Sequence, residues 1–466
     1  MVRRSARTGH MSIKAKLTTF DATMIVVSLI IGIGIFRTPA LVAQSARTPA
    51  LFFAAWALGG LISLVGALIF AEIGGRFAKP GGYYKVVAEN YGSGLAFMLN
   101  WTSVVVLNGA GAAAVALIGA EYLTPILFHG QTAGRETVQM TAVGLILVLL
   151  VINYLGIKTG AWAQNVLSLL KVVMIGVLAA AAFLSRKAPA GPPSLPLDRP
   201  WLFALGVSFI YVFYAYGGYQ NTINFGADVR DARRNVPRAI FFGILIVLAC
   251  YLTINVAYVK ALGVPGVAAA KLVAAETARV TFGEIGWLVV SLAIFLSAMG
   301  FLNVTLMQIP RVYYSMAEDR TLPRPFMAVN PRTQTQEFGL LFLGGLILAS
   351  IFLLGTFENI VNYVMFLDTI TLALVSSSIF LLRRKARRSG ETYTGYRVPL
   401  YPVLPILFVV FMLTIAANVL LTQTREALLG GLFFAAGFPV FLLMRAVSRR
   451  REDTPPPGSG PTSDPP

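Results

Sequence analysis

The chain has 466 residues, of which 56% are apolar and 12% are charged. A soluble domain carries about 25% charged residues, so this composition, with a mean hydropathy of +0.73, excludes an ordinary soluble protein. The net charge of +18 could suggest a nucleic-acid partner, but the basic residues are spread between long apolar runs. That distribution is typical of membrane proteins, whose basic residues lie in the loops between spans. We therefore expect the chain to lie in a lipid bilayer and not to bind nucleic acid.

The residues that commonly hold metals are few and scattered. The single cysteine, Cys250, lies inside an apolar run, which excludes a disulfide within the chain and a cysteine metal cluster. His10 and His129 lie in polar flanking segments without partner ligands. The sequence contains no Walker A motif and no histidine–carboxylate constellation. We therefore expect no metal, no cofactor and no enzyme activity.

Twelve apolar runs are long enough to cross a bilayer of roughly 30 Å. The first follows a basic segment, 1–19, and ends at the turn Arg37–Pro39; no small-residue cleavage site follows it, so a cleaved signal is not expected. The runs are continuous rather than alternating, which favours helices over a β-barrel. The predicted spans are 20–41, 51–78, 94–122, 138–156, 160–184, 201–227, 238–261, 284–316, 338–356, 359–382, 400–422 and 427–446.

The loops predict the orientation of these spans. Most of the 38 Lys and Arg residues fall in the N-terminal segment, the even-numbered loops and the C-terminal end. The positive-inside rule therefore places both termini in the cytoplasm of a multi-pass cell-membrane protein. The segments 1–19 and 447–466 are the predicted cytoplasmic tails, and the second, rich in Pro, Ser and Gly, is expected to be disordered.

The first ten spans divide into two halves of five, 20–185 and 200–382. Because five is odd, the second half runs inverted relative to the first. Each half opens with a span broken by glycine, at Gly32-Ile33-Gly34 and at Gly217-Gly218. Interrupted helices at matching positions of two inverted halves indicate a transporter binding site.

The breaks also predict the chemistry of the ligand. An unwound turn in lipid leaves backbone groups unsatisfied, at several kcal/mol each, unless a polar ligand fills the space. The carboxylate of a zwitterionic amino acid could accept hydrogen bonds from the N–H groups near Gly34–Phe36. Its ammonium could donate to free carbonyls at the ends of the inner half of span one and the outer half of span six. The alternative, that the glycines only allow close helix packing, explains one break better than two in register.

Several motifs, in order along residues 20–410, resemble the amino acid–polyamine–organocation superfamily and its L-type amino acid transporter-like branch. They are Ile30-Ile31-Gly32-Ile33-Gly34-Ile35-Phe36, Ala71-Glu72-Ile73-Gly74, Lys79-Pro80-Gly81-Gly82-Tyr83-Tyr84, Tyr214-Ala215-Tyr216-Gly217-Gly218-Tyr219, Asn235-Val236-Pro237-Arg238-Ala239-Ile240, Asn303 to Arg311 and Val398-Pro399-Leu400-Tyr401-Pro402. The resemblance implies an all-α five-plus-five inverted repeat with broken helices 1 and 6. It also implies two peripheral helices in 383–446, and sodium-independent transport or exchange of amino acids.

The same resemblance implies the roles of individual residues. Ile31, Ile33 and Gly34 would bind the substrate carboxylate by backbone, with Ile35 beside them. Tyr214 would cover the substrate as a gate, and Gly217 would leave room for its side chain. Ile33 stands where most relatives have a serine, so the substrate range stays open. The external cysteine that links mammalian members to a heavy subunit is absent between spans three and four, so no disulfide-linked partner is expected.

Three charges within the spans are further candidates. Lys171 would cost roughly 2.5–3.5 kcal/mol at mid-helix, which favours a function over snorkelling to the surface. The family places a lysine here, where its ammonium occupies the position of a bound sodium in sodium-coupled relatives; proton coupling stays open. Arg37 and Asp368 are expected to pair as an external gate. The alternative is that Arg37 reaches the headgroups while Asp368 bonds a hydroxyl such as Thr369.

Two other function classes stay open at this point. An amino acid sensor of the same fold would bind without net transport. A channel is less favoured, because no selectivity-filter run and no acidic ring occurs. The charged cluster Asp228, Arg230, Asp231, Arg233, Arg234 and Arg238 is interpreted as a solvated loop with mixed ion pairs.

Overall fold

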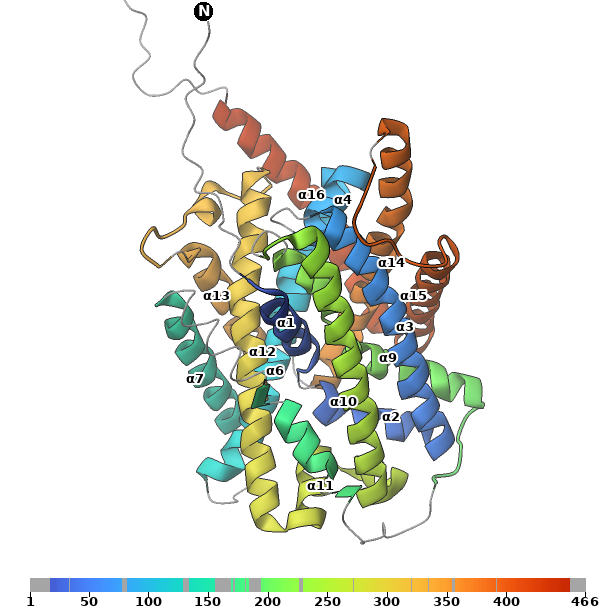
Figure 1. Ribbon diagram of the computed structural model, residues 1–466. Coiled ribbons are helices and arrows are strands. Elements are labelled where there is room, and N and C mark those ends of the chain that lie inside the picture. The colour runs from blue at the N-terminus through green and yellow to red at the C-terminus, as the bar shows by residue number, and fades with distance from the viewer. Residues whose placement is uncertain are drawn as a thin grey trace, which may run out of the picture.

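In the part of the chain that it describes, the computed structural model consists of helices and the segments that connect them (Figure 1), with one isolated β-bridge between Leu17 and Val229. The described residues are 17–32, 34–77, 82–128, 134–155, 169–170, 172–180, 182–183, 194–225, 229–270, 272–319, 321–333, 335–353, 357–390 and 392–452. The all-α prediction is confirmed over these ranges.

The helices of the first half begin with α1 (Thr19–Ile30), α2 (Gly34–Ala46), α3 (Pro49–Arg76) and α4 (Gly82–Tyr91). They continue with α5 (Ser93–Thr102), the π-helix η1 (Ser103–Ala110), α6 (Gly111–Leu127) and α7 (Arg135–Tyr154). Of the fifth predicted span, 160–184, residues 172–180 are helical, whereas Lys171 and residues 160–168 lie outside the described residues.

The second half begins with α9 (Trp201–Tyr216), the 3₁₀ helix η2 (Tyr219–Phe225), α10 (Ala232–Ala269) and α11 (Val273–Phe282). It continues with α12 (Glu284–Glu318), the 3₁₀ helix η3 (Arg324–Met327), α13 (Glu337–Leu353) and α14 (Phe357–Ser389). The last two helices are α15 (Val403–Thr422) and α16 (Thr424–Glu452).

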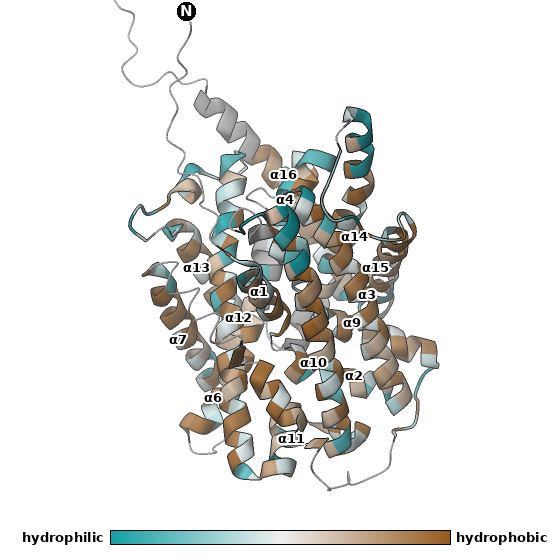
Figure 2. Ribbon diagram, in the orientation of Figure 1, coloured by the Kyte–Doolittle hydropathy of each residue, from teal (hydrophilic) through white to brown (hydrophobic). Residues whose placement is uncertain are grey.

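The helices are those of a polytopic membrane protein. Within the described residues, eight helices are long and apolar enough to cross a membrane, and α1 with α2 forms a ninth candidate, bent by 40°. The predicted spans 338–356 and 427–446 correspond to shorter apolar helices, Glu337–Leu353 and Ala427–Leu443. Figure 2 shows hydrophobic residues along the middle of the helices and hydrophilic ones at their ends. The total of twelve spans remains a prediction.

The turn expected at Arg37–Pro39 was wrong, because α2 continues through Pro39 to Ala46. Proline removes one backbone donor, and such losses are tolerated in transmembrane helices when nearby groups compensate. The carbonyl that loses its helical donor at Pro39 is that of Ile35, whereas the Thr38 hydroxyl donates to the Gly34 carbonyl of the same turn over 2.8 Å. Two short helices, α4 and α11, also lie in segments that the sequence analysis treated as loops.

Small residues allow the central helices to approach closely. An added Cβ at Gly59 or Gly60 of α3 would lie 2.3 Å from Val212 of α9 or Leu248 of α10. A Cβ at Gly243 of α10 would lie 2.4 Å from Val26 of α1. Because lipid tails are as apolar as leucine, close packing of this kind stabilises contacts between membrane helices. It also brings α1, α9 and α10 together around the middle of the bundle.

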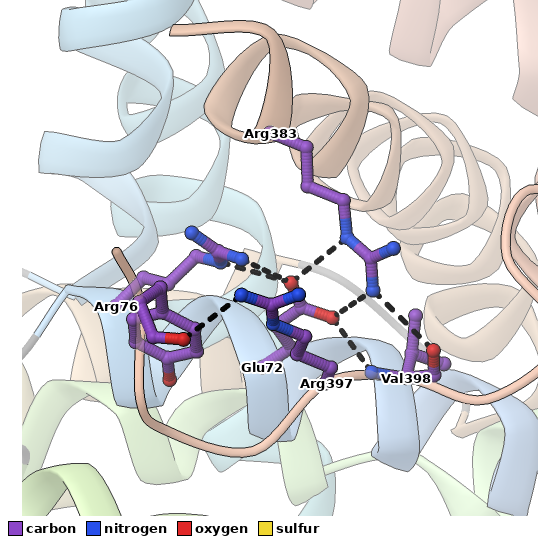
Figure 3. Close-up of polar contacts among 6 residues, drawn as sticks. Glu72, Arg76, Arg383, Arg397 and Val398 are labelled. Carbon is purple, nitrogen blue, oxygen red and sulfur yellow. Dashed lines mark hydrogen bonds and ion pairs between the residues drawn. The ribbon is translucent and has the colours of Figure 1, made fainter. Parts of the chain in front are cut away.

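The carboxylate of Glu72 is the centre of a network of arginines and backbone groups (Figure 3). The Glu72 side chain of α3 is 0% exposed. Its Oε1 accepts hydrogen bonds from Arg76 over 2.9 Å and from Arg383 of α14 over 3.0 Å. Its Oε2 accepts from Arg383 over 2.6 Å and from the backbone N–H of Val398 over 2.7 Å.

Aromatic rings complete this Glu72 network. The Arg76 guanidinium lies 3.9 Å from the ring centroid of Tyr393, and the Arg383 guanidinium 3.8 Å from that of Tyr401. Both rings belong to the segment between α14 and α15. The network therefore joins α3, α14 and the segment between α14 and α15 through one carboxylate, that of Glu72.

We expect Glu72→Ala to lower the free energy of unfolding by about 3–5 kcal/mol, because two largely buried guanidinium groups would lose their carboxylate. The measurement is the thermal transition of the detergent-solubilised protein, followed by size-exclusion chromatography. Glu284→Ala is the matched control: Glu284 is 77% exposed and pairs with Arg279 over 3.0 Å, and such surface pairs contribute about 0–1 kcal/mol. Equal transitions for the two variants would contradict the central role of Glu72.

Candidate functional site

The first break separates α1 from α2 and leaves backbone polar groups inside the bundle. The Ile31 N–H still donates to the Val27 carbonyl, and the Gly32 N–H donates to the Ile30 carbonyl, each over 2.7 Å. The next helix begins at Gly34, which is buried. The N–H groups of the first turn of α2 have no partner within their own helix, so the break presents donors to the interior.

The second break follows α9 at Tyr216. Gly217 is extended, with φ −62° and ψ 154°. Gly218 has φ +124°, a conformation that essentially requires glycine. Its N–H donates to Oε1 of Gln220 over 2.9 Å, which folds the Gln220 side chain back across the break.

The two breaks lie against each other. A Cβ at Gly34 would lie 2.8 Å from the Cα of Ala215, and a Cβ at Gly218 would lie 2.2 Å from the Leu29 carbonyl oxygen. Tyr251 of α10 joins them, because its hydroxyl lies 3.0 Å from the carbonyl oxygens of both Ile30 and Ala215. One hydroxyl proton is thus shared between two carbonyls, one from each break.

A cavity of about 140 Å³ opens where the breaks meet. One water occupies about 30 Å³ in the liquid, so the space suits a small organic molecule better than a single water. Its lining combines bare backbone, aromatic rings and polar side chains. The glycines are Gly32, Gly34, Gly111, Gly217 and Gly218; the aromatic residues are Phe70, Phe213, Tyr214 and Phe301; the polar residues are Asn108, Gln220, Asn221, Thr305, Gln308, Asp368 and Thr371.

The structure brings some of the predicted site residues together at this cavity. Gly34, Tyr214, Gly217 and Asp368 all line it. A Cβ at Gly217 would contact only carbonyl oxygens of its own helix, so Gly217 faces the open space. Asp368 is the charged residue of the lining, as far as the described residues show.

Other predicted residues lie elsewhere. The side chains of Ile31 and Ile35 are 0% exposed and pack in the core, outside the cavity lining. Arg37 lies on α2, one turn after Gly34, and is likewise not among the lining residues. Ile33 and Lys171 lie outside the described residues.

Sequence reasoning did not single out several polar residues of the lining. Gln308 of α12 is 3% exposed, and its Oε1 finds no hydrogen-bond donor in the described part of the chain. Asn108 lies in the π-helix η1, where its Nδ2 donates to the Ser103 carbonyl over 2.7 Å. Such bulges in α-helices are frequent at functional sites. Each residue is a polar side chain within an apolar run, a signal that could have identified it.

The hydroxyls of Thr305 and Thr371 donate back to carbonyls of their own helices, over 2.9 and 2.8 Å. Their oxygens keep lone pairs that can accept further hydrogen bonds. The cavity therefore presents backbone donors from the breaks together with acceptors from Thr305, Gln308, Asp368 and Thr371. A small molecule carrying both charges would find complementary groups here.

The chain matches known proteins over almost its whole length. The family model for amino acid permeases matches residues 17–438. The serine/threonine exchanger SteT of Bacillus subtilis (strain 168) is 28% identical over 438 residues, which cover 93% of this chain and 97% of the exchanger. The human b(0,+)-type amino acid transporter 1 is 26% identical, with 93% of this chain and 88% of the transporter covered. The rabbit (Oryctolagus cuniculus) large neutral amino acids transporter small subunit 2 is also 26% identical, with 93% and 81% covered.

These relatives are transporters or exchangers of amino acids, and none of them is an enzyme by its name. Family model, relatives and apolar helices agree with the motifs quoted from the sequence. The chain therefore belongs to the amino acid permease family of the amino acid–polyamine–organocation superfamily, in its L-type amino acid transporter-like branch.

Proposed function

We propose that the chain is a secondary active transporter that moves amino acids by alternating access. The observation that carries this proposal is the cavity at the meeting point of the two breaks, with backbone from both and Asp368 in its wall. The substrate carboxylate would accept N–H groups of the first turn of α2, where the helix dipole is positive. The substrate ammonium would bind carbonyls at the ends of α1 and α9.

The residues that line the cavity would determine the size and polarity of the substrate side chain. Gly217 and Gly111 leave room, since a Cβ at Gly111 would have no heavy atom within 4 Å. Tyr214 lines the same space, which supports the proposed role of its ring as a cover. The free acceptor of Gln308 would select a substrate that can donate a hydrogen bond, because a buried acceptor left unsatisfied is unfavourable.

Alternating access would follow from two inverted five-helix repeats, 20–185 and 200–382, with the helices of 383–446 at the periphery. The facing breaks of α1–α2 and α9–η2 support this arrangement. Transport would be sodium-independent, with the ammonium of Lys171 in place of the cation. The sensor of the same fold remains the alternative, and only a transport measurement separates it from a transporter.

The proposed setting is the cell membrane, with both termini in the cytoplasm and no disulfide-linked heavy subunit. The clustering of basic residues in the N-terminal segment, the even-numbered loops and the C-terminal end supports the orientation. The lone cysteine, Cys250, belongs to α10, which supports the absence of an external disulfide.

We expect proteoliposomes that contain the purified chain and are loaded with unlabelled amino acids to accumulate labelled substrate by counterflow. Replacing sodium with choline should leave uptake unchanged, because no sodium site is required. Lys171→Ala should lower uptake while the protein still elutes as a folded species. Binding without counterflow would favour the sensor, and loss of uptake in choline would overturn the role of Lys171.

Gly111→Leu should weaken substrate binding without loss of folding, because its side chain would extend into open cavity space. Overpacking costs about 1–3 kcal/mol, which corresponds to a loss of affinity of about 5- to 150-fold. Gly144→Leu is the matched control: Gly144 is also a helical glycine with no neighbour within 4 Å of an added Cβ, but it lies on α7 outside the lining. Isothermal titration with the substrate found by counterflow measures both; unchanged affinity in Gly111→Leu would place the site elsewhere.

We propose that Arg37 and Asp368 pair above the substrate when the external side closes. Each of Arg37→Ala and Asp368→Ala should impair uptake, because a lone charge would remain in the bundle. The double charge swap, Arg37→Asp with Asp368→Arg, should recover part of it. A double-mutant cycle on transport rates gives the coupling, expected at about 0.5–3 kcal/mol; additive effects would reject the gate.

A further inference from the structure

A second cavity, of about 1080 Å³, lies at one end of α10 and also borders Thr19 at the start of α1; its lining shares no residue with that of the first cavity. Arginines from the first two turns of α10 line it: Arg233, Arg234 and Arg238. The segment between α14 and α15 contributes Thr394, Gly395 and Tyr396. Figure 2 shows hydrophilic residues at this end of α10.

The sequence of α10 fixes the depth of this cavity in the membrane. Residues 239–259 carry no charge, and Arg238 and Lys260 bound them. At 1.5 Å per residue this stretch spans roughly 31 Å, which matches the roughly 30 Å of a hydrocarbon core. Arg238 therefore lies at one surface of the core, at the level of the lipid headgroups.

The wall of the cavity changes character at that level. Phe241 and Phe242, also in the lining, lie three and four residues beyond Arg238, roughly 5–6 Å deeper. Their side chains are 38% and 51% exposed. Exposed phenylalanines at this depth contact acyl chains, whereas Arg233 and Arg234 lie toward the water.

The positive charge is only partly balanced. Asp231 is the one acidic residue in the lining among the described residues, against three arginines. All three arginines are exposed, and none of their side chains pairs with a carboxylate in the part of the chain that the structure describes. The mixed ion pairs expected for this cluster are therefore not seen there, and Asp228 lies outside the described residues.

Two further groups suit a phosphate. The N-terminus of α10, at Ala232, carries unpaired N–H groups and the positive end of the helix dipole. Burial raises the pKa of Tyr396 to about 12, so its hydroxyl stays neutral and can donate.

We propose that this cavity binds the headgroup of an anionic phospholipid, with its phosphate on Arg233, Arg234 and Arg238 and its acyl chains along Phe241 and Phe242. A basic pocket between transmembrane helices at the headgroup level has the chemistry for such lipids. The site is separate from the amino acid cavity, so it does not depend on the proposed transport activity.

The test measures lipid binding to the purified chain in detergent by native mass spectrometry. Phosphatidylglycerol should bind at least about ten-fold more tightly than phosphatidylcholine, since each arginine near a headgroup contributes about 1 kcal/mol and 1.4 kcal/mol is ten-fold. The triple variant Arg233→Gln, Arg234→Gln and Arg238→Gln should remove this preference. The corresponding triple Lys variant should retain most of it, because the charge is kept.

The matched control is Arg384→Gln, Arg387→Gln and Arg388→Gln, which removes the same charge from exposed positions at the end of α14. This control should keep the preference for phosphatidylglycerol. If both triple Gln variants lost the preference for phosphatidylglycerol equally, general surface charge would explain that preference and the proposal would be overturned. Complete displacement of the lipid by millimolar inorganic phosphate would identify a free-anion site and would also overturn it.

Discussion

The rest of the structure depends on one constraint: two helices stop inside an apolar bundle, and their free backbone groups must be satisfied there. In hydrocarbon each unsatisfied group costs several kcal/mol. Tyr251 meets part of this cost, because one buried hydroxyl lies 3.0 Å from a carbonyl of each break. The start of α2 at Gly34 and the side chain of Asp368 both line the cavity beside these breaks.

The glycine pattern was sufficient to predict both breaks, because glycines at matching positions of the two predicted halves favour interrupted helices over simple close packing. The contacts of each glycine could not be predicted. Gly34 was expected to bind the substrate by its backbone and Gly217 to leave room for it, yet a Cβ at Gly34 would meet the backbone of Ala215, whereas Gly217 faces the cavity. Gly34 is therefore required first for the contact between α2 and α9. That distinction depends on the relative register of two helices far apart in the sequence.

The same limit applies to polar partners. Glu72 belongs to a motif that was quoted from the sequence, but its partners, Arg383 and the N–H of Val398, lie more than three hundred residues away. Nothing local to Ala71-Glu72-Ile73-Gly74 selects Arg383 from the other basic residues at the end of α14. Gln308 and Tyr251 were overlooked for a similar reason: a single polar residue in an apolar run acquires its role only from what faces it.

Two groups of arginines lie near the segment between α14 and α15, and they differ in burial. Arg76 and Arg383 have side chains 10% and 15% exposed, and both pair with Glu72, since a cation removed from water requires a carboxylate. Arg233, Arg234 and Arg238 are exposed at the headgroup level, where the bilayer itself can supply the anion. Tyr393 lies between the two groups, because its ring stacks on Arg76 and its segment also borders the second cavity. An anionic lipid in the second cavity would contact the segment between α14 and α15. The same segment is bound by the Glu72 network, so a change in lipid composition would affect the segment that links α3 to α14.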